Sequence, residues 1–194
     1  MRSIIGVSGR VRRGSFNTML LRAASELAPP GVTVDVTSVR GIPLDDGDVE
    51  AAEGVPAIVE ELKNRIAASD GLLIASPEYN NSIAGVMKNA IAWLSRPPAG
   101  IARVFAGRAV AIIGATPGLG GTTAAQVAWL PVLRTLKMLP WFGDRLTVPS
   151  AGHVFDFEGR LIDDALRARL GAFVKGFAAF AAQHGPNGPD ATRS

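Results

Sequence analysis

The chain of 194 residues has a mass of 20.2 kDa, which is enough for one sizeable domain and too little for two comfortable ones. It contains no cysteine, and this excludes disulfides, thiolate nucleophiles, iron–sulfur clusters and cysteine-ligated zinc. Its 20 basic and 17 acidic residues differ by three, the number of arginines clustered at positions 10, 12 and 13. The excess charge therefore indicates a local anion site, and no nucleic-acid partner is expected.

Short apolar runs alternate along the chain with longer segments of helical spacing. We expect strands at residues 3–8, 32–39, 71–76, 109–114 and 146–148. We expect helices at residues 16–27, 55–66, 83–94, 122–138 and 163–183, the third capped by Ser82 and the fourth kinked or divided at Pro131. This alternation predicts an α/β fold with a doubly wound, five-stranded parallel sheet and helices on both faces. Residues 1–184 are expected to form one domain, and residues 185–194 a mobile tail.

No export signal or membrane span is expected. The segment before Arg10 is too short for the charged and apolar parts of a signal peptide. Charged side chains such as Arg108 and Lys175 interrupt the apolar stretches before they reach the roughly 18 residues of a spanning helix. These observations predict a cytoplasmic protein.

An open sheet of this kind binds its ligand beyond the carboxyl ends of the strands. Three distinctive loops follow strands at that edge, and the first lies at residues 9–17. Backbone amides, hydroxyls and arginines meet there at the start of a helix, which suits a phosphate monoester. The competing interpretation is a solvated basic turn in which Ser15 only caps the helix, but crowded arginines repel one another without an anion. The loop is not a Walker A motif, because Ser15 and Phe16 replace the required Lys and Ser or Thr.

The other two loops carry weaker signals. The second, Ser-Pro-Glu-Tyr-Asn-Asn-Ser at residues 76–82, offers peptide groups and a ring to a flat heteroaromatic ligand. A capped turn, in which Glu78 and Asn80 bond only local backbone, is an equal alternative. The third, residues 114–122, is rich in glycine, which permits close approach to a ligand but also serves turns that need positive φ.

Two segments, residues 9–17 and 76–97, resemble the NAD(P)H-dependent FMN reductase family, a flavodoxin-like group that includes quinone and chromate reductases. Residues 116–121 and 155–163 are similar to the family as well, so the resemblance spans nearly the whole chain. It implies an oxidoreductase that passes hydride from NADPH or NADH to FMN and then to a small acceptor such as a quinone, free flavin or chromate. Because the flavin carries the chemistry, no catalytic side chain and no metal are expected.

The resemblance also implies three groups of FMN-binding residues: one for the phosphate, one for the isoalloxazine edge and one in the opposing loop. They are Arg12, Ser15 and Asn17; then Pro77, Glu78, Tyr79 and Asn80 with Ser82 in support; and Thr116, Gly118 and Gly121. The sequence departs from the family at Arg10, where serine is usual, so Arg10 either adds a phosphate contact or points outward. Ala84 replaces the usual proline before Gly85, which bears on the stiffness of that loop.

Alternative functions remain open at this point. A flavodoxin-like one-electron carrier is one, although such carriers are usually acidic and lack an arginine-rich phosphate loop. A non-catalytic flavin-binding regulatory protein is another, and it would bind FMN without turnover. A hydrolase that uses Ser8 and His153 is the least favoured, because no local motif assembles it.

The resemblance further implies a homodimer or homotetramer in which a neighbouring subunit lies over the flavin. The helix after Ser82 is the candidate interface, although Trp93 on that helix is expected to belong to the core. The physiological acceptor and the choice between NADH and NADPH depend on the shape of the pocket, which the sequence does not define.

Overall fold

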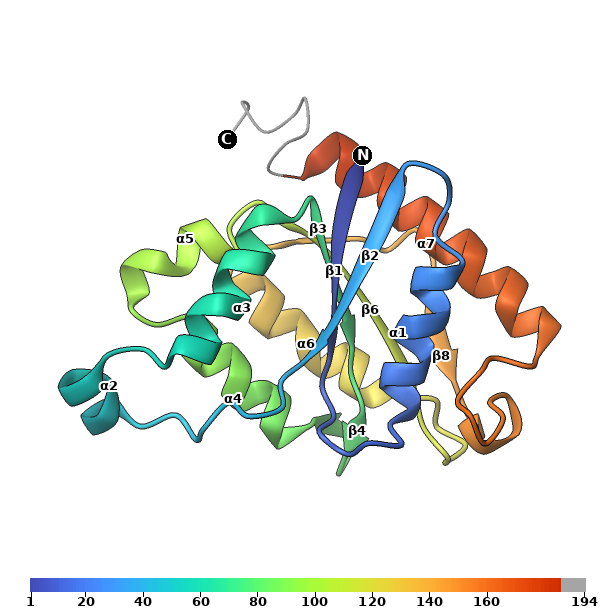
Figure 1. The fold of residues 1–194 in the computed structure, drawn as a ribbon, viewed down its shortest axis with the longest axis horizontal. Coiled ribbons are helices and arrows are strands. Elements are labelled where there is room, and N and C mark those ends of the chain that lie inside the picture. The colour runs from blue at the N-terminus through green and yellow to red at the C-terminus, as the bar shows by residue number, and fades with distance from the viewer. Residues whose placement is uncertain (186–194) are drawn as a thin grey trace.

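The computed structural model describes residues 1–185, which fold around one central sheet (Figure 1). The strands of this sheet are β1 (Arg2–Ser8), β2 (Val32–Ser38), β3 (Gly71–Ala75), β6 (Ala109–Ala115), β7 (Leu139–Pro140) and β8 (Leu146–Val148). Their order is β2-β1-β3-β6, with β7 and β8 both paired to the outer edge of β6, and every pair is parallel. The expected doubly wound parallel sheet is therefore confirmed, and the order reverses between β1 and β3.

The fifth position of the sheet differs from the expected single strand, because β7 and β8 share it. β7 pairs with Ala109 and Val110, whereas β8 pairs with the last three residues of β6. Between them the chain leaves the sheet at Trp141, whose ring packs edge-on against Phe173 with centroids 4.8 Å apart. The contact fastens this connecting segment to α7 (Asp164–His184).

Helices cover both faces of the sheet, as expected (Figure 1). One face carries α1 (Phe16–Glu26) and α7 (Asp164–His184). The other carries α3 (Ala57–Ala68), α4 (Gly85–Leu94), α5 (Ile101–Val104) and α6 (Thr123–Thr135). None of the helices within residues 1–185 combines the length and the apolarity that crossing a bilayer requires.

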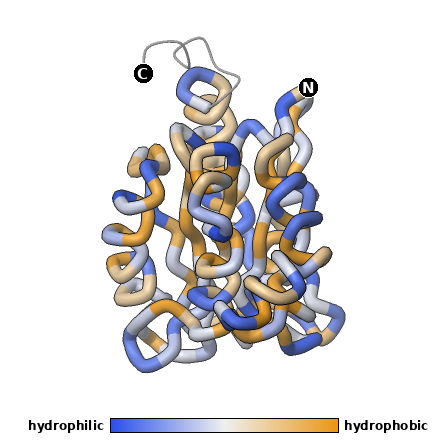
Figure 2. The backbone as a smooth tube through the Cα atoms, turned by 90° about the vertical axis from the view of Figure 1, so that its left-hand side faces the viewer, coloured by the Kyte–Doolittle hydropathy of each residue, from blue (hydrophilic) through white to orange (hydrophobic). Residues whose placement is uncertain are grey.

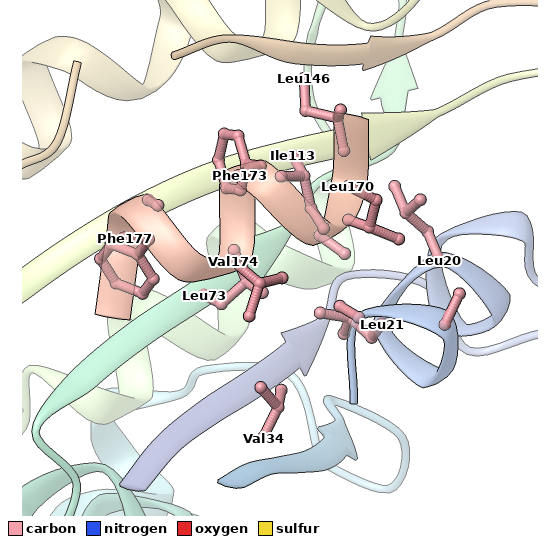
Figure 3. Packing of buried hydrophobic residues seen from close by; sticks show 14 of the residues in the cluster. Leu20, Leu21, Val34, Leu73, Ile113, Leu146, Leu170, Phe173, Val174 and Phe177 are labelled. Atoms are coloured by element: carbon pink, nitrogen blue, oxygen red, sulfur yellow. The ribbon is translucent and has the colours of Figure 1, made fainter. Parts of the chain in front are cut away.

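The apolar strands lie between these helical layers, where hydrophobic residues gather in the middle of the molecule (Figure 2). On the α1 and α7 face, Leu20 and Leu21 pack with Phe173 and Phe177 over Leu73 (Figure 3). Phe173 and Phe177 of α7 are thus core residues, each at most 1% exposed, while Phe180 is partly buried against the same cluster. Trp93 is also fully buried, as expected, and its Nε1 donates to the carbonyl of Pro43 at 3.0 Å.

Several local expectations are wrong or incomplete. Ser82 does not cap α4, which begins at Gly85; Ser82 instead belongs to β5 (Ser82–Ile83), the partner of β4 (Glu78–Tyr79) in a separate hairpin. Pro131 does not divide α6, because buried Trp129 and Leu133 hold the helix against the core on both sides of the proline. Apart from Gly185, the tail expected at 185–194 lies outside the described residues. The sequence analysis did not identify the short helices α2 (Gly47–Glu53), η1 (Pro98–Gly100) and η2 (Ala151–His153).

A buried arginine, Arg108, lies at the amino end of β6, at the edge of the sheet opposite to the carboxyl ends of the strands. The guanidinium of Arg108 donates to the backbone carbonyls of Val104, at 2.7 Å, and of Ser69. Burial lowers the pKa of Arg108 to about 10, although the charge of Asp70 opposes this shift. These hydrogen bonds give the buried guanidinium the acceptors that a buried charge requires.

Candidate functional site

The three loops singled out in the sequence follow β1, β3 and β6, and they lie together at the lower edge of the sheet in Figure 1. A small cavity of about 40 Å³ is lined by residues of all three. Its walls are Arg10, Arg12, Gly14, Phe16, Asn17, Pro77, Glu78, Ala115, Thr116 and Pro117. Because parallel strands bring their carboxyl ends to one edge, this meeting of distant segments follows from the topology.

The first loop approaches the second so closely that only glycine fits at position 9. A Cβ on Gly9 would lie 2.9 Å from Cδ of Pro77 and 3.2 Å from Cβ of Met87. The Gly9 amide also donates to the carbonyl of Ala75 at 2.9 Å. Ser15 then begins α1 as its N-cap, with its buried Oγ accepting from the amide of Thr18 at 3.3 Å.

Asn17 ties the first loop to the third. It is buried at the start of α1, where its Nδ2 donates to the carbonyl of Ala115 at 2.9 Å. Its Oδ1 accepts from the Ala115 amide at 3.0 Å. These two hydrogen bonds leave one N–H of the Asn17 amide for a ligand, so the residue positions the loops in addition to any contact with a phosphate.

The arginines give the first loop an uncompensated positive charge. Arg12 and Arg13 are exposed, and Arg12 Nε donates to the carbonyl of Gly14 at 3.1 Å. Arg10 is half-buried, with its guanidinium carbon 5.2 Å from the centroid of the Tyr79 ring. Among the described residues none of the three forms an ion pair with a carboxylate. Together with the N-terminus of α1, they form a site suited to an anion.

The second loop is a tight β-hairpin, which the sequence analysis treated only as a turn. Glu78 and Tyr79 pair with Ile83 and Ser82, and the connecting Asn80 and Asn81 have φ values of 51° and 59°. Two successive positive φ angles define a type I′ hairpin turn, and asparagine tolerates this conformation better than most residues. The Asn-Asn pair was the available signal for this hairpin.

Glu78 joins the second loop to the third. Its Oε2 accepts a hydrogen bond from the amide of Ala125, in the first turn of α6, at 2.9 Å. The N-cap of α6 is Thr122, which has a φ of 68° and makes no side-chain capping bond. The Glu78 carboxylate therefore caps α6 from a distance in sequence, and the alternative that Glu78 bonds only local backbone is wrong.

The third loop packs directly on the second. A Cβ on Gly114 would lie 2.1 Å from Oγ1 of Thr122 and 2.6 Å from the carbonyl oxygen of Ser76, so this position requires glycine. Trp129 Nε1 in α6 donates to Oγ of Ser76 at 2.9 Å. Within the described residues, Thr122 Oγ1 is the buried side-chain polar atom left without a hydrogen-bond partner.

The structure brings together only part of the predicted set. Arg12, Asn17, Pro77, Glu78 and Thr116 line the cavity, and Ser15 lies buried beside it. Five others do not line it: Tyr79, Asn80, Ser82, Gly118 and Gly121. Tyr79 and Asn80 lie on the exposed hairpin at its rim, and Gly121 has a φ of 64° that its turn requires. The cavity also contains residues that the sequence analysis left out of the set, among them Arg10, Phe16 and Pro117.

The chemistry of this cavity suits the phosphate of a nucleotide, and its size excludes a ring system. About 40 Å³ is close to the ~30 Å³ that one water occupies in the liquid and far below the ~150 Å³ of a cavity that admits benzene. A ring system is therefore too large to enter it. The positive charge of Arg10 and Arg12 in its wall matches a phosphorylated ligand.

A larger apolar hollow of about 280 Å³ lies elsewhere, between α6 and the segment at Trp141 and Phe142. Neither the first loop nor the hairpin contributes to it. This hollow is larger than the crevice, but the basic crevice at the β1/β3 reversal has the chemistry of a nucleotide site.

The fold is flavodoxin-like, and its three loops form a basic crevice at the carboxyl edge of the sheet. The sequence model of the family described as NADPH-dependent FMN reductase matches residues 2–153. The chain belongs to this family. It is an NAD(P)H-dependent oxidoreductase, with FMN as its cofactor.

Similar proteins agree with this assignment. The NAD(P)H-dependent FMN reductase PA1204 of Pseudomonas aeruginosa is 43% identical over 164 residues, which cover 84% of this chain and 86% of that protein. The quinone reductase of Escherichia coli is 41% identical over 179 residues, covering 88% and 92%. Among solved structures, the flavoenzyme NAD(P)H:(acceptor) oxidoreductase FerB of Paracoccus denitrificans has a TM-score of 0.84 at 27% identity, covering 95% of this chain and 100% of that one.

Proposed function

We propose that this protein reduces quinones, using electrons from NADPH or NADH that pass through FMN bound in the crevice. The observation that carries the proposal is the meeting of three loops around one basic cavity. Relatives named for quinone reduction support the acceptor class. Besides the Escherichia coli protein, a 2-hydroxy-1,4-benzoquinone reductase of a Burkholderia species is 34% identical over 174 residues, covering 90% of this chain and 93% of that protein.

The chain's own residues bind and orient in this proposal. Arg12, Ser15 and Asn17 hold the phosphate, each charge-assisted hydrogen bond contributing about 1.5–3 kcal/mol. The backbone from Pro77 to Asn80 borders the ring edge, while Thr116 of the third loop lies on the opposite side. The chemistry that FMN supplies when bound is the transfer of a hydride from the nicotinamide to a two-electron acceptor. No side-chain nucleophile is needed.

We further propose that the protein is a homodimer or homotetramer that associates through α4. A hollow of about 300 Å³ between α4 and α6 is lined largely by apolar groups, including Ile91, Ala92 and Val132. Val86, on the same helix α4 as Ile91 and Ala92, is 40% exposed. The test is the molar mass in solution of Val86→Asp, because aspartate suits the first turn of a helix and preserves folding. A mass equal to that of the unchanged protein would argue against this interface.

A cytoplasmic location is part of the proposal, because the enzyme depends on a supply of reduced nicotinamide. Turnover distinguishes the proposed enzyme from the two alternatives, because a one-electron carrier oxidises nicotinamide slowly and a non-catalytic flavin protein shows no acceptor-dependent nicotinamide oxidation. Chromate and free flavin are tested as acceptors beside the quinone, since the same open rim can admit them.

The proposal is tested by anaerobic reduction. The FMN-loaded protein is titrated with NADPH and separately with NADH, and the visible flavin absorbance is followed. We expect at least one nicotinamide to bleach the flavin stoichiometrically, and 1,4-benzoquinone to restore the colour with repeated turnover. A flavin that neither nicotinamide bleaches would overturn the proposed enzyme, and bleaching without recovery by quinone would overturn the proposed acceptor.

A further inference from the structure

Arg10, which lies outside the expected set of site residues, contacts Tyr79, which belongs to it. Its guanidinium carbon lies 5.2 Å from the centroid of the Tyr79 ring, within the range of a cation–π interaction. Arg10 belongs to the first loop and Tyr79 to the hairpin of the second. The contact therefore spans the crevice between the phosphate end and the rim where the ring system would lie.

The surroundings of Arg10 leave this stack without a competing interaction. In the part of the chain that the structure describes, Arg10 has no carboxylate partner, and it is half-buried in the wall of the cavity. Tyr79 is 37% exposed, so its ring has a face available for the guanidinium. A serine at position 10 would be too short to reach the ring.

The hairpin depends on contacts of this kind for its position. It consists of two short strands joined by Asn80 and Asn81, and an isolated two-stranded hairpin is only marginally stable in water. Glu78 anchors one side of the hairpin to α6. The next residue, Tyr79, is held toward the first loop by the contact between its ring and the guanidinium of Arg10.

We propose that Arg10 is a positioning residue that clamps Tyr79 at the rim of the crevice and thereby slows the release of FMN. This inference rests on the proposed function, since it assigns a role at the same FMN site. The contact on which the proposal depends is the Arg10 guanidinium stacked on the phenol ring of Tyr79. The phosphate of FMN is held by other residues: Arg12, Ser15 and Asn17. The consequence is a slower rate of FMN dissociation than a serine at position 10 would allow.

The test compares FMN dissociation rates, measured by the rise in flavin fluorescence when the FMN-loaded protein is diluted. We expect Arg10→Ser and Tyr79→Leu each to accelerate release about two- to fivefold, the effect of an exposed cation–π pair. The double variant should release FMN no faster than the single variants, because both remove the same interaction. Tyr79→Phe keeps an aromatic ring for the guanidinium and should release FMN more slowly than Tyr79→Leu.

Arg13→Ser is the matched control, because it removes the same charge from the same loop at an exposed side chain without a ring contact. Equal rates for Arg10→Ser and Arg13→Ser would overturn the proposal, as would fully additive effects of Arg10→Ser and Tyr79→Leu. Urea midpoints equal to that of the unchanged protein show that the variants fold. An unchanged protein that binds no FMN would overturn the proposed function itself, which is a distinct result.

Discussion

Glu78 offers the sharpest test of how the site is assembled, because one hydrogen bond connects the hairpin to α6. Replacing it by alanine removes the carboxylate that accepts from the Ala125 amide at 2.9 Å. Loss of a side-chain cap costs about 0.5–2 kcal/mol, and loss of a negative charge near a helix N-terminus costs about 0.3–1 kcal/mol. We therefore expect Glu78→Ala to lower the free energy of unfolding by about 1–2 kcal/mol, and Glu78→Gln, which keeps an acceptor, by less.

The assay is urea denaturation of the FMN-free protein, so that ligand binding does not contribute to the measured stability. Glu61→Ala is the control, because Glu61 is exposed and makes no hydrogen bond or ion pair within residues 1–185. It should change stability by no more than about 0.5 kcal/mol. If Glu78→Ala is as stable as Glu61→Ala, the carboxylate does not cap α6 and the account of the second and third loops is wrong.

Three further predictions concern other parts of the fold. Gly114→Ala places a methyl group 2.1 Å from Thr122 Oγ1, so we expect a loss of about 1–3 kcal/mol in urea denaturation and weaker FMN binding; wild-type values for both would refute the predicted clash. Arg108→Met removes the donors to the Val104 and Ser69 carbonyls and should lower the free energy of unfolding by about 2–3 kcal/mol. An unchanged melting temperature in calorimetry would contradict this. Hydrogen bonds from the Arg160 backbone and side chain hold the pKa of Asp156 below its usual value. The stability that Asp156 contributes is thus present at neutral pH and lost as the pH falls through that lowered pKa, and Asp156→Asn should flatten this acid limb in urea titrations.

The layered fold was predictable because burial fixes it. Strands that are apolar on both faces, such as Gly71–Ala75, have nowhere to lie except between two layers of helices. The phenylalanines of α7 follow a helical stripe for the same reason. The division of the fifth strand position of the sheet into β7 and β8 was not predictable, because the segment between them packs through Trp141 against Phe173 of α7, a residue distant in the sequence.

The site was predictable in its location and less so in its contacts. Strand topology brings the three loops to one edge, and residue types mark the first loop as basic. The roles of Glu78 and Asn17 depend instead on partners that are 47 and 98 residues away in the sequence. Such long-range pairs leave no local pattern, and the same is true of Arg10 on Tyr79. The Asn80 and Asn81 turn did leave one, since two asparagines in a row favour positive φ.

The central claim, that the basic first loop grips the phosphate of the flavin, is tested most directly by comparing the affinities of the FMN-free protein for FMN and for riboflavin. Riboflavin has the same ring system and lacks the phosphate. Two charge-assisted hydrogen bonds, at about 1.5 kcal/mol each, correspond to a preference for FMN on the order of a hundredfold. We predict a preference of at least this size, which diminishes in Arg12→Ala. Equal affinities for the two flavins would contradict the account.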